Sequence, residues 1–571
     1  MTRDRLISAA KVVALTLAIG GAAAWALSGY WIYLATAVLI VAINLLSLGV
    51  VEGRTGMISL CQLSFAGVGA WAVGYLNVAG APGGLPVWIL IGGLAAVPFG
   101  VAIGLPALRL RGINLAIVTL GFASAFDAVL AATTFPGQTQ FLQVPRPDGF
   151  DGDASYFLFV LMAFAILAGG LQLVAGSRLG ASWLAIRHSE RAAAAHGVGV
   201  PAAKLSAFAV SAFVAGVAGG LMAGYLGTLV ADNFTMFGSL SLFAVATMTG
   251  AQNAEGAVVG GLLVTLFPEL LRRLSLPQDI GNVLFAVGAV QALASGETAS
   301  ESLRRLAGKL VPRRKRAAAR LRRENLPGKR DHGEAPALVV RGLTVRYGAV
   351  TALDRVDFDV PARMVVGLIG PNGAGKSTFI DAVTGFLPTY LGDIDIGGAP
   401  MAARAAHARA RMGVRRTWQT NRIAPELTAG AYLALAAGGL PQAQLDAALA
   451  WIGLPDARMP VAAIDAGARR LLDVAGVVAA RPALALLDEP AAGQSYDEAL
   501  RLAERIAEIP DLFGSAVLLV DHDMDLVRRA CAAVTVMDFG KVIASGPTAR
   551  VLDLPAVKIA YLGTVGTEAA A

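Results

Sequence analysis

Cysteine is nearly absent from this chain, which has only Cys61 and Cys531 among its 571 residues. Two cysteines in so long a chain cannot form the dense disulfide framework of small secreted domains. No CxxC spacing offers a zinc-binding site. These observations exclude a disulfide-stapled scaffold and a zinc-binding module, and they indicate that the more polar half of the chain resides in a reducing compartment.

Charged residues are also scarce, at 15% of the chain, whereas hydrophobic residues make up 56% and the mean hydropathy is +0.62. Average soluble domains are about 25% charged and 45–50% apolar. The apolar excess is concentrated in residues 1–300, where 12–51 and 155–177 contain no charged residue, while 336–563 resembles an ordinary soluble domain in composition. We therefore expect a membrane-embedded first half and a soluble second half.

Ten apolar segments in the first half approach the length of about 20 residues that a helix needs to cross a bilayer. They fall around 11–28, 32–51, 63–80, 85–105, 113–133, 156–175, 205–226, 239–251, 256–271 and 280–295. Several are short or interrupted by glycine. The expected fold is therefore an α-helical polytopic membrane domain with eight to ten spans, followed by a separate soluble domain.

Three segments of the first half depart from apolar helix. Residues 52–62 (EGRTGMISLCQ) place polar residues at expected membrane depth, which is compatible with a substrate path or with a simple interhelical loop. The acidic, proline-containing loop 134–154 is expected outside the cell. Residues 177–204 are basic and are expected in the cytoplasm; within them, 185–198 has the composition of a short helix outside the bilayer, or else of a solvated loop.

A strongly basic segment follows the last apolar run. Between Arg304 and Arg330 lie twelve Lys or Arg residues and one acidic residue, so the segment carries a formal charge of +11 in a chain of net charge +7. Such a flank is typical of the cytoplasmic side of a membrane and attracts anionic lipid headgroups. No aromatic residues are interleaved with the charges, so we expect membrane lipid and not nucleic acid as its partner.

The second half contains a complete phosphate-binding loop. An apolar strand over 364–369 leads into the sequence GPNGAGKST, which fits GxxxxGK[ST] and precedes a helix-forming run. Glycines allow successive N–H groups to surround phosphates, and the helix N-terminus adds favourable partial charge. We expect ATP to bind Gly370, Pro371, Asn372, Gly373, Ala374, Gly375, Lys376, Ser377 and Thr378. Lys376 would reach the β- and γ-phosphates, and the Ser377 hydroxyl would ligate Mg²⁺.

Further polar residues follow expected strands. A buried-strand run over 483–487 ends at Asp488 and Glu489, which are placed to hold Mg²⁺ and to act as general base toward the attacking water, respectively. A strand over 516–520 is followed by His522, a candidate γ-phosphate contact. Gln419 is a candidate bridge between Mg²⁺ and the attacking water. By themselves, two acids can cap a strand, and a histidine or a glutamine can be an ordinary surface residue.

The order of these elements, which begins with an expected strand over 338–347, resembles the ATP-binding cassette of ABC transporters over roughly 338–563. The resemblance identifies Tyr347 as the aromatic residue that stacks on adenine, 370–378 as the Walker A loop, Gln419 as the Q-loop residue, Asp488 and Glu489 as Walker B, and His522 as the switch histidine. Ala491-Ala492-Gly493 and Asp521-His522-Asp523-Met524 are most similar to the cassettes of branched-chain amino-acid importers.

The first half resembles the permease of the same system. The stretches 55–60, 108–121 and 185–197 carry this resemblance, and the last corresponds to the coupling helix that docks on a cassette. It implies an α/β P-loop cassette at 336–571, a basic cytoplasmic linker at 301–335 and a permease domain at 1–300 in the cell membrane. It also implies an ATPase that imports branched-chain amino acids, with urea and short amides as alternative solutes. A separate solute-binding protein and a second permease and cassette subunit are the implied partners, with a heteromer favoured.

The signature sequence departs from the family pattern. Where the family has a Leu-Ser-Gly-Gly-Gln-like segment, this chain has Ile464-Asp465-Ala466-Gly467-Ala468. The Asp465 carboxylate would repel a phosphate at short range, or it would cap the following helix. Because a signature acts on the nucleotide held by the opposite cassette, we expect an asymmetric pair with one strong and one weak ATPase site. A homodimer with two impaired sites is the alternative.

Other classes of protein fit the sequence less well. Exporters of the common type have about six long helices with large cytoplasmic extensions, and a non-transporting ATPase with a cassette has no apolar spans. An ATP-binding subunit with weak turnover remains compatible with the altered signature, although Glu489 and His522 favour catalysis.

Overall fold

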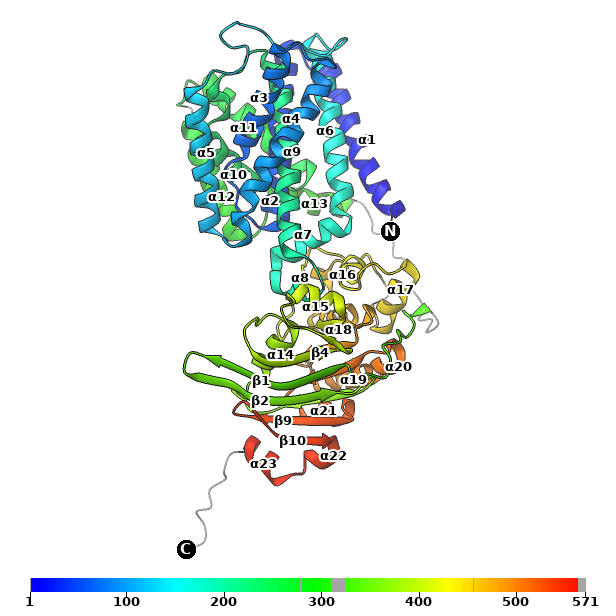
Figure 1. Cartoon of the computed structure of the whole chain (residues 1–571). Coiled ribbons are helices and arrows are strands. Elements are labelled where there is room, and N and C mark those ends of the chain that lie inside the picture. The colour runs from blue at the N-terminus through cyan, green and yellow to red at the C-terminus, as the bar shows by residue number, and fades with distance from the viewer. Residues whose placement is uncertain (1, 278, 311–324, 455, 563–571) are drawn as a thin grey trace. The chain divides into compact units, whose positions relative to one another are not determined.

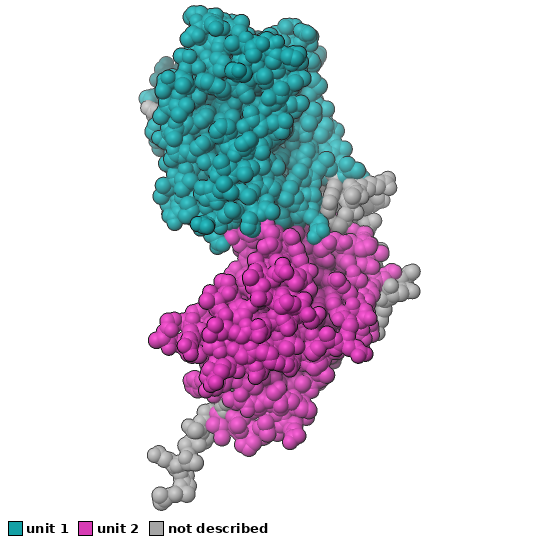
Figure 2. All heavy atoms as spheres, viewed as in Figure 1, with its two compact units in different colours: residues 1–183, 201–315 teal, residues 184–200, 316–571 magenta. Residues whose placement is uncertain are grey.

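The computed structural model describes the chain except for residues 1, 278, 311–324, 455 and 563–571. It consists of two compact units (Figure 2). Unit 1 comprises residues 1–183 and 201–315, and unit 2 comprises residues 184–200 and 316–571. The core of the expected basic linker, 311–324, lies outside the described residues. The units do not follow chain order, because a short piece of the permease-like sequence, 184–200, belongs to unit 2.

Unit 1 is a bundle of helices that run side by side (Figure 1). Its α-helices are α1 Thr2–Ala26, α2 Gly29–Thr55, α3 Gln62–Val78, α4 Gly84–Gly104, α5 Ile113–Ala132, α6 Asp153–Ala175, α9 Val200–Leu226, α10 Met236–Thr249, α11 Ala254–Arg273, α12 Asp279–Ser295 and α13 Ala299–Leu310. Short 3-10 helices occupy Pro106–Leu108 and Ala231–Phe234, and α7 (Arg178–His188) contains the boundary between the units. Each of the ten apolar segments corresponds to one of these helices.

Seven helices among the described residues are long and apolar enough to cross a membrane, and the bent pair α12–α13 raises the number to eight if it forms one span. The expected range of eight to ten spans is therefore met at its lower end. The difference comes chiefly from α3 and α10, which have 17 and 14 residues and fall below the typical length of about 20.

Small residues bring α3 and α9 into close contact. A Cβ atom on Gly69 would overlap the backbone of Gly216, and one on Gly219 would overlap the backbone of Ala66. Lipid supplies no hydrophobic drive for helix association, so van der Waals packing between close backbones stabilises such pairs.

The polar stretch at 52–62 is only partly irregular. Helix α2 continues through Thr55, and Gly56 at its end adopts a left-handed φ of 69°. The non-helical residues 56–61 then lead into α3, where the Gln62 side chain donates hydrogen bonds to Ser47 and Ser211 at 2.6 and 2.9 Å. The stretch is thus mostly buried within the bundle and hydrogen-bonded to it, which is how irregular backbone is tolerated at membrane depth.

Unit 2 contains two sheets. The first has the order β2-β1-β4-β5 and is antiparallel, and the second has the order β10-β9-β3-β8-β7-β6, in which β9, β3, β8, β7 and β6 are parallel. The strands are β1 Leu338–Tyr347, β2 Val350–Val360, β3 Val365–Ile369, β4 Leu391–Ile396, β5 Ala399–Pro400, β6 Val414–Arg416, β7 Leu484–Asp488, β8 Ala516–Val520, β9 Ala533–Asp538 and β10 Lys541–Pro547. The four strands expected from the sequence are present to within one residue at each end.

Helices surround these sheets in unit 2 (Figure 1). They are α8 Glu190–Ala195, α14 Lys376–Thr384, α15 Ala406–Met412, α16 Ala429–Ala436, α17 Gln442–Trp451, α18 Ala466–Ala479, α19 Tyr496–Ala507, α20 Ile509–Phe513, α21 Met524–Ala530, α22 Thr548–Val551 and α23 Pro555–Leu562. The helix expected at 185–198 is present in two parts, because Ser189 separates α7 from α8 and caps α8 by accepting a hydrogen bond from the Ala192 amide.

Candidate functional site

The candidate site lies at the carboxyl edge of the parallel sheet. Strand β3 leads into the glycine-rich loop, β7 ends at Asp488, β8 is followed by His522, and β6 is followed by Gln419. Carboxyl ends of neighbouring parallel strands meet at one edge, where α/β proteins bind their ligands. The residues predicted from four separate stretches of sequence therefore converge because of the strand order.

The glycine-rich loop has the backbone conformation that its glycines permit. Gly375, at the start of α14, has a left-handed φ of 98°. A Cβ on Gly370 would overlap the Met537 carbonyl. The Lys376 ammonium donates to the carbonyls of Gly370 and Pro371 at 2.6 and 2.9 Å, so it lies inside the loop. Burial lowers the Lys376 pKa, while the nearby carboxylates of Glu489 and Asp488 act in the opposite direction.

Two predicted catalytic residues are in direct contact. Gln419 Nε2 donates to Glu489 Oε2 at 2.6 Å. Glu489 follows β7 with a left-handed φ of 45°, and its amide donates to the Val520 carbonyl of β8 at 2.7 Å. A non-glycine residue in this region is strained, and the strain is sustained where the surroundings fix the backbone. The carboxylate of Glu489 is thus held in a defined position at the sheet edge.

Asp488 has a cationic partner that the sequence analysis did not identify. Arg416, at the end of β6, donates to Asp488 Oδ2 at 2.9 Å and to Asp381 of α14 at 2.5 Å. The Thr417 hydroxyl accepts a hydrogen bond from the Asp488 amide. Burial raises the Asp488 pKa, and Arg416 opposes that rise. Because Arg416 contacts the Asp488 carboxylate through Oδ2, Oδ1 can accept a bond from another partner.

This oxygen set fits Mg²⁺. The donors expected to hold it, the Ser377 hydroxyl, the Asp488 carboxylate and the Gln419 amide oxygen, are the hard oxygen ligands that Mg²⁺ prefers. The Gln419–Glu489 contact uses the amide nitrogen and leaves the amide oxygen for another partner. The number of protein ligands is small, as is usual where phosphates and water complete the coordination of Mg²⁺.

Tyr347 and His522 are both exposed to solvent. Tyr347 ends β1, is 53% exposed and pairs with Val350 across a tight turn. The His522 side chain is 69% exposed and lies 3.8 Å from the buried Asp521, which accepts hydrogen bonds from the backbone amides of His522 and Asp523. Their contacts with nucleotide stay predictions.

Within the altered signature sequence, Asp465 caps a helix. Asp465 Oδ1 accepts a hydrogen bond from the Ala468 amide at 2.7 Å at the start of α18. This is one of the two roles expected for Asp465, and aspartate is among the preferred N-cap residues. The capping bond occupies one carboxylate oxygen and does not remove the negative charge.

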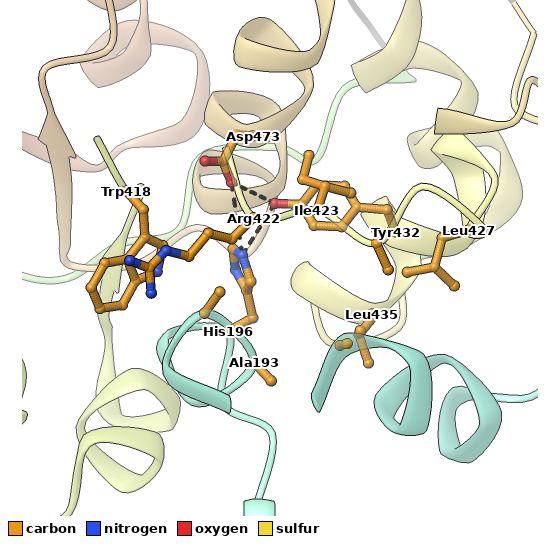
Figure 3. Close-up of a pocket in the computed structure, with 12 residues that line it drawn as sticks. Ala193, His196, Trp418, Arg422, Ile423, Leu427, Tyr432, Leu435 and Asp473 are labelled. Atoms are coloured by element: carbon orange, nitrogen blue, oxygen red, sulfur yellow. Dashed lines mark hydrogen bonds and ion pairs between the residues drawn. The ribbon is translucent and has the colours of Figure 1, made fainter. Parts of the chain in front are cut away.

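A buried polar triad joins residues 184–200 to the helices that follow the Q-loop residue. Tyr432 of α16 donates to Asp473 of α18 at 2.6 Å and lies 3.1 Å from Nε2 of His196 (Figure 3). All three side chains are buried. Burial raises the Asp473 pKa to about 6 and lowers the His196 pKa to about 3, so the carboxyl holds a proton more readily and the imidazole is neutral at physiological pH.

A chain of ion pairs links the same segment to Walker B. Arg191 of α8 pairs with Asp381 at 3.2 Å, and Asp381 in turn pairs with Arg416, the partner of Asp488. The Arg191 guanidinium also lies over the ring of Trp418, 5.7 Å from its centroid, while Arg416 lies over the same ring at 4.2 Å. Residues 184–200 thus have electrostatic and aromatic contacts that reach the candidate site.

A side chain of α18 holds the backbone at the Q-loop residue Gln419 in place. Arg470 donates to the carbonyls of Trp418 and Gln419. Sequence analysis missed Arg416, Arg470 and the triad, since each acts through a partner distant in sequence. One signal was available for Arg416, because an arginine within a buried strand requires an anionic partner.

Comparison with known proteins agrees with this geometry. Residues 30–290 match the family model described as the branched-chain amino acid transport system permease component, and residues 353–492 match the ABC transporter family model. The high-affinity branched-chain amino acid transport ATP-binding proteins LivG of Salmonella typhimurium and BraF of Pseudomonas aeruginosa are each 34% identical over 250 residues. Each alignment covers 40% of this chain and 98% of the relative.

A solved nucleotide-free ATP-binding cassette from an ABC transporter is 24% identical, with a TM-score of 0.36, and the match covers 40% of this chain and all of that chain. Two family models on consecutive parts of one chain, together with nearly complete coverage of the curated relatives, establish the relationship. The chain belongs to the ABC transporters of the branched-chain amino acid transport type and combines a permease component and an ATP-binding component in one multi-pass membrane polypeptide.

Proposed function

We propose that this chain imports branched-chain amino acids across the cell membrane and drives the transport by ATP hydrolysis in a cytoplasmic cassette. The observation that carries the proposal is that residues 184–200, from the permease sequence, form part of the same compact unit as the nucleotide loop. Because residues 184–200 lie between permease helices in the sequence, they link the permease sequence to the unit that carries the nucleotide loop.

In this proposal, each site residue has a defined role. Tyr347 stacks on adenine, the amides of residues 370–378 surround the phosphates, and Lys376 neutralises the β- and γ-phosphates. Glu489 accepts a proton from the attacking water, and the contact with Gln419 supports its orientation. His522 contacts the γ-phosphate. Ser377, Gln419 and Asp488 would hold Mg²⁺, which would neutralise the charge that develops on the transferring phosphoryl group.

Coupling between the halves follows the ion-pair chain. Any change at the Asp488 carboxylate alters the electrostatic environment of Arg416, which shares its guanidinium with Asp381. Asp381 also holds Arg191 of the permease segment. Charged groups in such a series respond to one another strongly where they are partly buried. Nucleotide binding therefore changes the strength with which α8 is held.

The assembly is proposed to be a heteromer. The permease domain is assigned to 1–300, the basic cytoplasmic linker to 301–335 and the cassette to 336–571, completed by 184–200. A second permease and cassette subunit supplies the signature for the site built on Lys376, while Asp465 weakens the partner's site. A separate solute-binding protein delivers the amino acid. The alternative is an ATP-binding subunit with weak turnover, which the charge retained on the capped Asp465 favours.

Uptake by the complex in proteoliposomes tests the function. The complex with its binding protein is expected to accumulate labelled leucine, isoleucine or valine in an ATP-dependent manner, and Glu489→Gln is expected to abolish this uptake. Urea and short amides serve as competing solutes. Transport of urea but of no amino acid would overturn the solute assignment, and an unchanged hydrolysis rate in Glu489→Gln would overturn the role of Glu489. Equal turnover at both nucleotide sites would contradict the asymmetric pair.

A further inference from the structure

A polar cavity in unit 1 has no role in the proposed ATPase chemistry. It has a volume of about 330 Å³ and lies among α1, the C-terminal part of α2, α6, the start of α11 and α13. One water molecule needs about 10–15 Å³ of such space, so the cavity is roughly twenty to thirty times larger than a single hydration site. It has room for a small polar group such as a lipid headgroup.

The lining of this cavity is cationic. Lys11, Arg54 and Arg304 face it, against the single carboxylate of Glu255, which pairs with Arg304. Arg54 Nη2 donates to the Gln252 carbonyl at 3.0 Å, and a guanidinium has five N–H donors in total. Among the described residues, no carboxylate pairs with Lys11 or Arg54. The partly buried lining therefore has an excess of positive charge, which an anion would stabilise.

One wall of the cavity is apolar. Val12 of α1, Leu46 of α2 and Leu171 of α6 contribute to it. A free inorganic anion gains nothing from such a wall. A ligand with a phosphate and an attached hydrocarbon part matches both sides of the cavity.

Helix α13 supplies an independent indication of a lipid surface. It carries Arg304 of the cavity and, beside it, Leu303 and Leu306, both of which are exposed. Basic residues on one side and exposed leucines on the other are typical of a helix that lies in the membrane interface. The cavity therefore opens next to a segment suited to the headgroup region of a bilayer.

We propose that this cavity binds the phosphate group of an anionic phospholipid. Arg54 and Lys11 hold the phosphate, Arg304 lies at the rim of the site, and the apolar wall contacts the start of an acyl chain. Arginine binds phosphate through two parallel N–H···O bonds, and basic pockets between membrane helices bind anionic headgroups. The bound lipid would join α1, α2, α11 and α13 at one end of the bundle.

Native mass spectrometry of the full chain purified in detergent tests the proposal with three probes: phosphatidylglycerol, phosphatidylcholine and inorganic phosphate. Phosphatidylglycerol is expected to bind, and Arg54→Gln is expected to weaken this binding by about tenfold or more, since the guanidinium makes charge-assisted hydrogen bonds to the phosphate. Lys11→Gln, at an exposed position where folding is not at risk, is expected to weaken it by about threefold. Arg109→Gln, an exposed residue outside the cavity, is the matched control.

Each contrary outcome is distinct. If Arg54→Gln and Lys11→Gln bind phosphatidylglycerol as tightly as the control Arg109→Gln does, the proposed lipid site is wrong. Equal binding of phosphatidylcholine would overturn the charge argument. Complete displacement of the lipid by millimolar inorganic phosphate would assign the cavity to a free anion. None of these outcomes depends on transport activity, so a failure here leaves the proposed import function unaffected.

Discussion

The triad of His196, Tyr432 and Asp473 permits a sharp prediction about Tyr432→Phe. The substitution keeps the ring and removes the hydroxyl that donates to Asp473 at 2.6 Å and lies 3.1 Å from His196. The Trp418 amide remains as a donor to the carboxylate. Loss of a buried hydrogen bond to a charged group costs about 2 kcal/mol. In a folded unit as large as unit 2, a loss of about 2 kcal/mol in the free energy of unfolding lowers Tm by about 4–8 °C.

The cost is expected to depend on pH. Burial raises the Asp473 pKa from 3.8 to about 6, so the folded state binds the proton more readily, and stability is lost as pH rises through this range. The Tyr432 hydroxyl opposes the rise; without it the folded-state pKa increases further. The variant is therefore destabilised more at pH 8 than at pH 5, where the protonated carboxyl loses only a neutral hydrogen bond worth about 1 kcal/mol.

Thermal unfolding of the purified full chain, followed by intrinsic fluorescence, measures this effect at both pH values. His196, whose pKa is lowered to about 3, is neutral in the folded state at both pH values, so its charge in the folded state does not differ between the two measurements. Tyr496→Phe, at an exposed tyrosine, is the control and is expected to leave Tm unchanged. Equal losses at pH 5 and pH 8, or an equal loss in the Tyr496 variant, would refute the reasoning.

Three further predictions concern unit 2. Arg416→Gln leaves Asp381 and Asp488 without their shared cation and is expected to destabilise the unit by about 3–5 kcal/mol, seen as a large drop in Tm; an unchanged Tm would contradict the buried pairing. Asp465→Ala is expected to cost about 1 kcal/mol in thermal unfolding, whereas Asp465→Ser keeps the cap; equal Tm values would show that the cap does not stabilise α18. Arg191→Gln is expected to lower uptake per ATP hydrolysed, as measured in proteoliposomes, and an unchanged ratio would refute the ion-pair route.

The sequence predicted the parts of the site that local patterns encode. The Walker A loop and Glu489 directly follow apolar strands, and Asp488 ends one; such strands are recognisable from a few residues. The contact between Gln419 and Glu489 was not predictable, since it depends on β6 and β7 being neighbours in the sheet. Sequence reasoning identified the residues, and the strand order brought them together.

The parts that escaped prediction depend on pairings across long sequence separations. His196 and Asp473 are each unremarkable in sequence, as an isolated polar residue in an alanine-rich or leucine-rich stretch. Only the docking of residues 184–200 on α16 and α18 places them around Tyr432. Among the described residues, seven or eight helices are long and apolar enough to cross a membrane, and hydropathy alone does not show where the shorter α3 and α10 begin and end.

The membership of residues 184–200 in unit 2 has a consequence for synthesis on the ribosome. His196 is made 277 residues before Asp473, and at about 5–20 residues per second the interval is roughly 15–55 s. During that interval, the alanine-rich turn of α8 has been synthesised but its partner surface does not yet exist. Chaperone demand, and the time available for premature cleavage, should therefore be greatest between completion of the membrane helices and completion of α18.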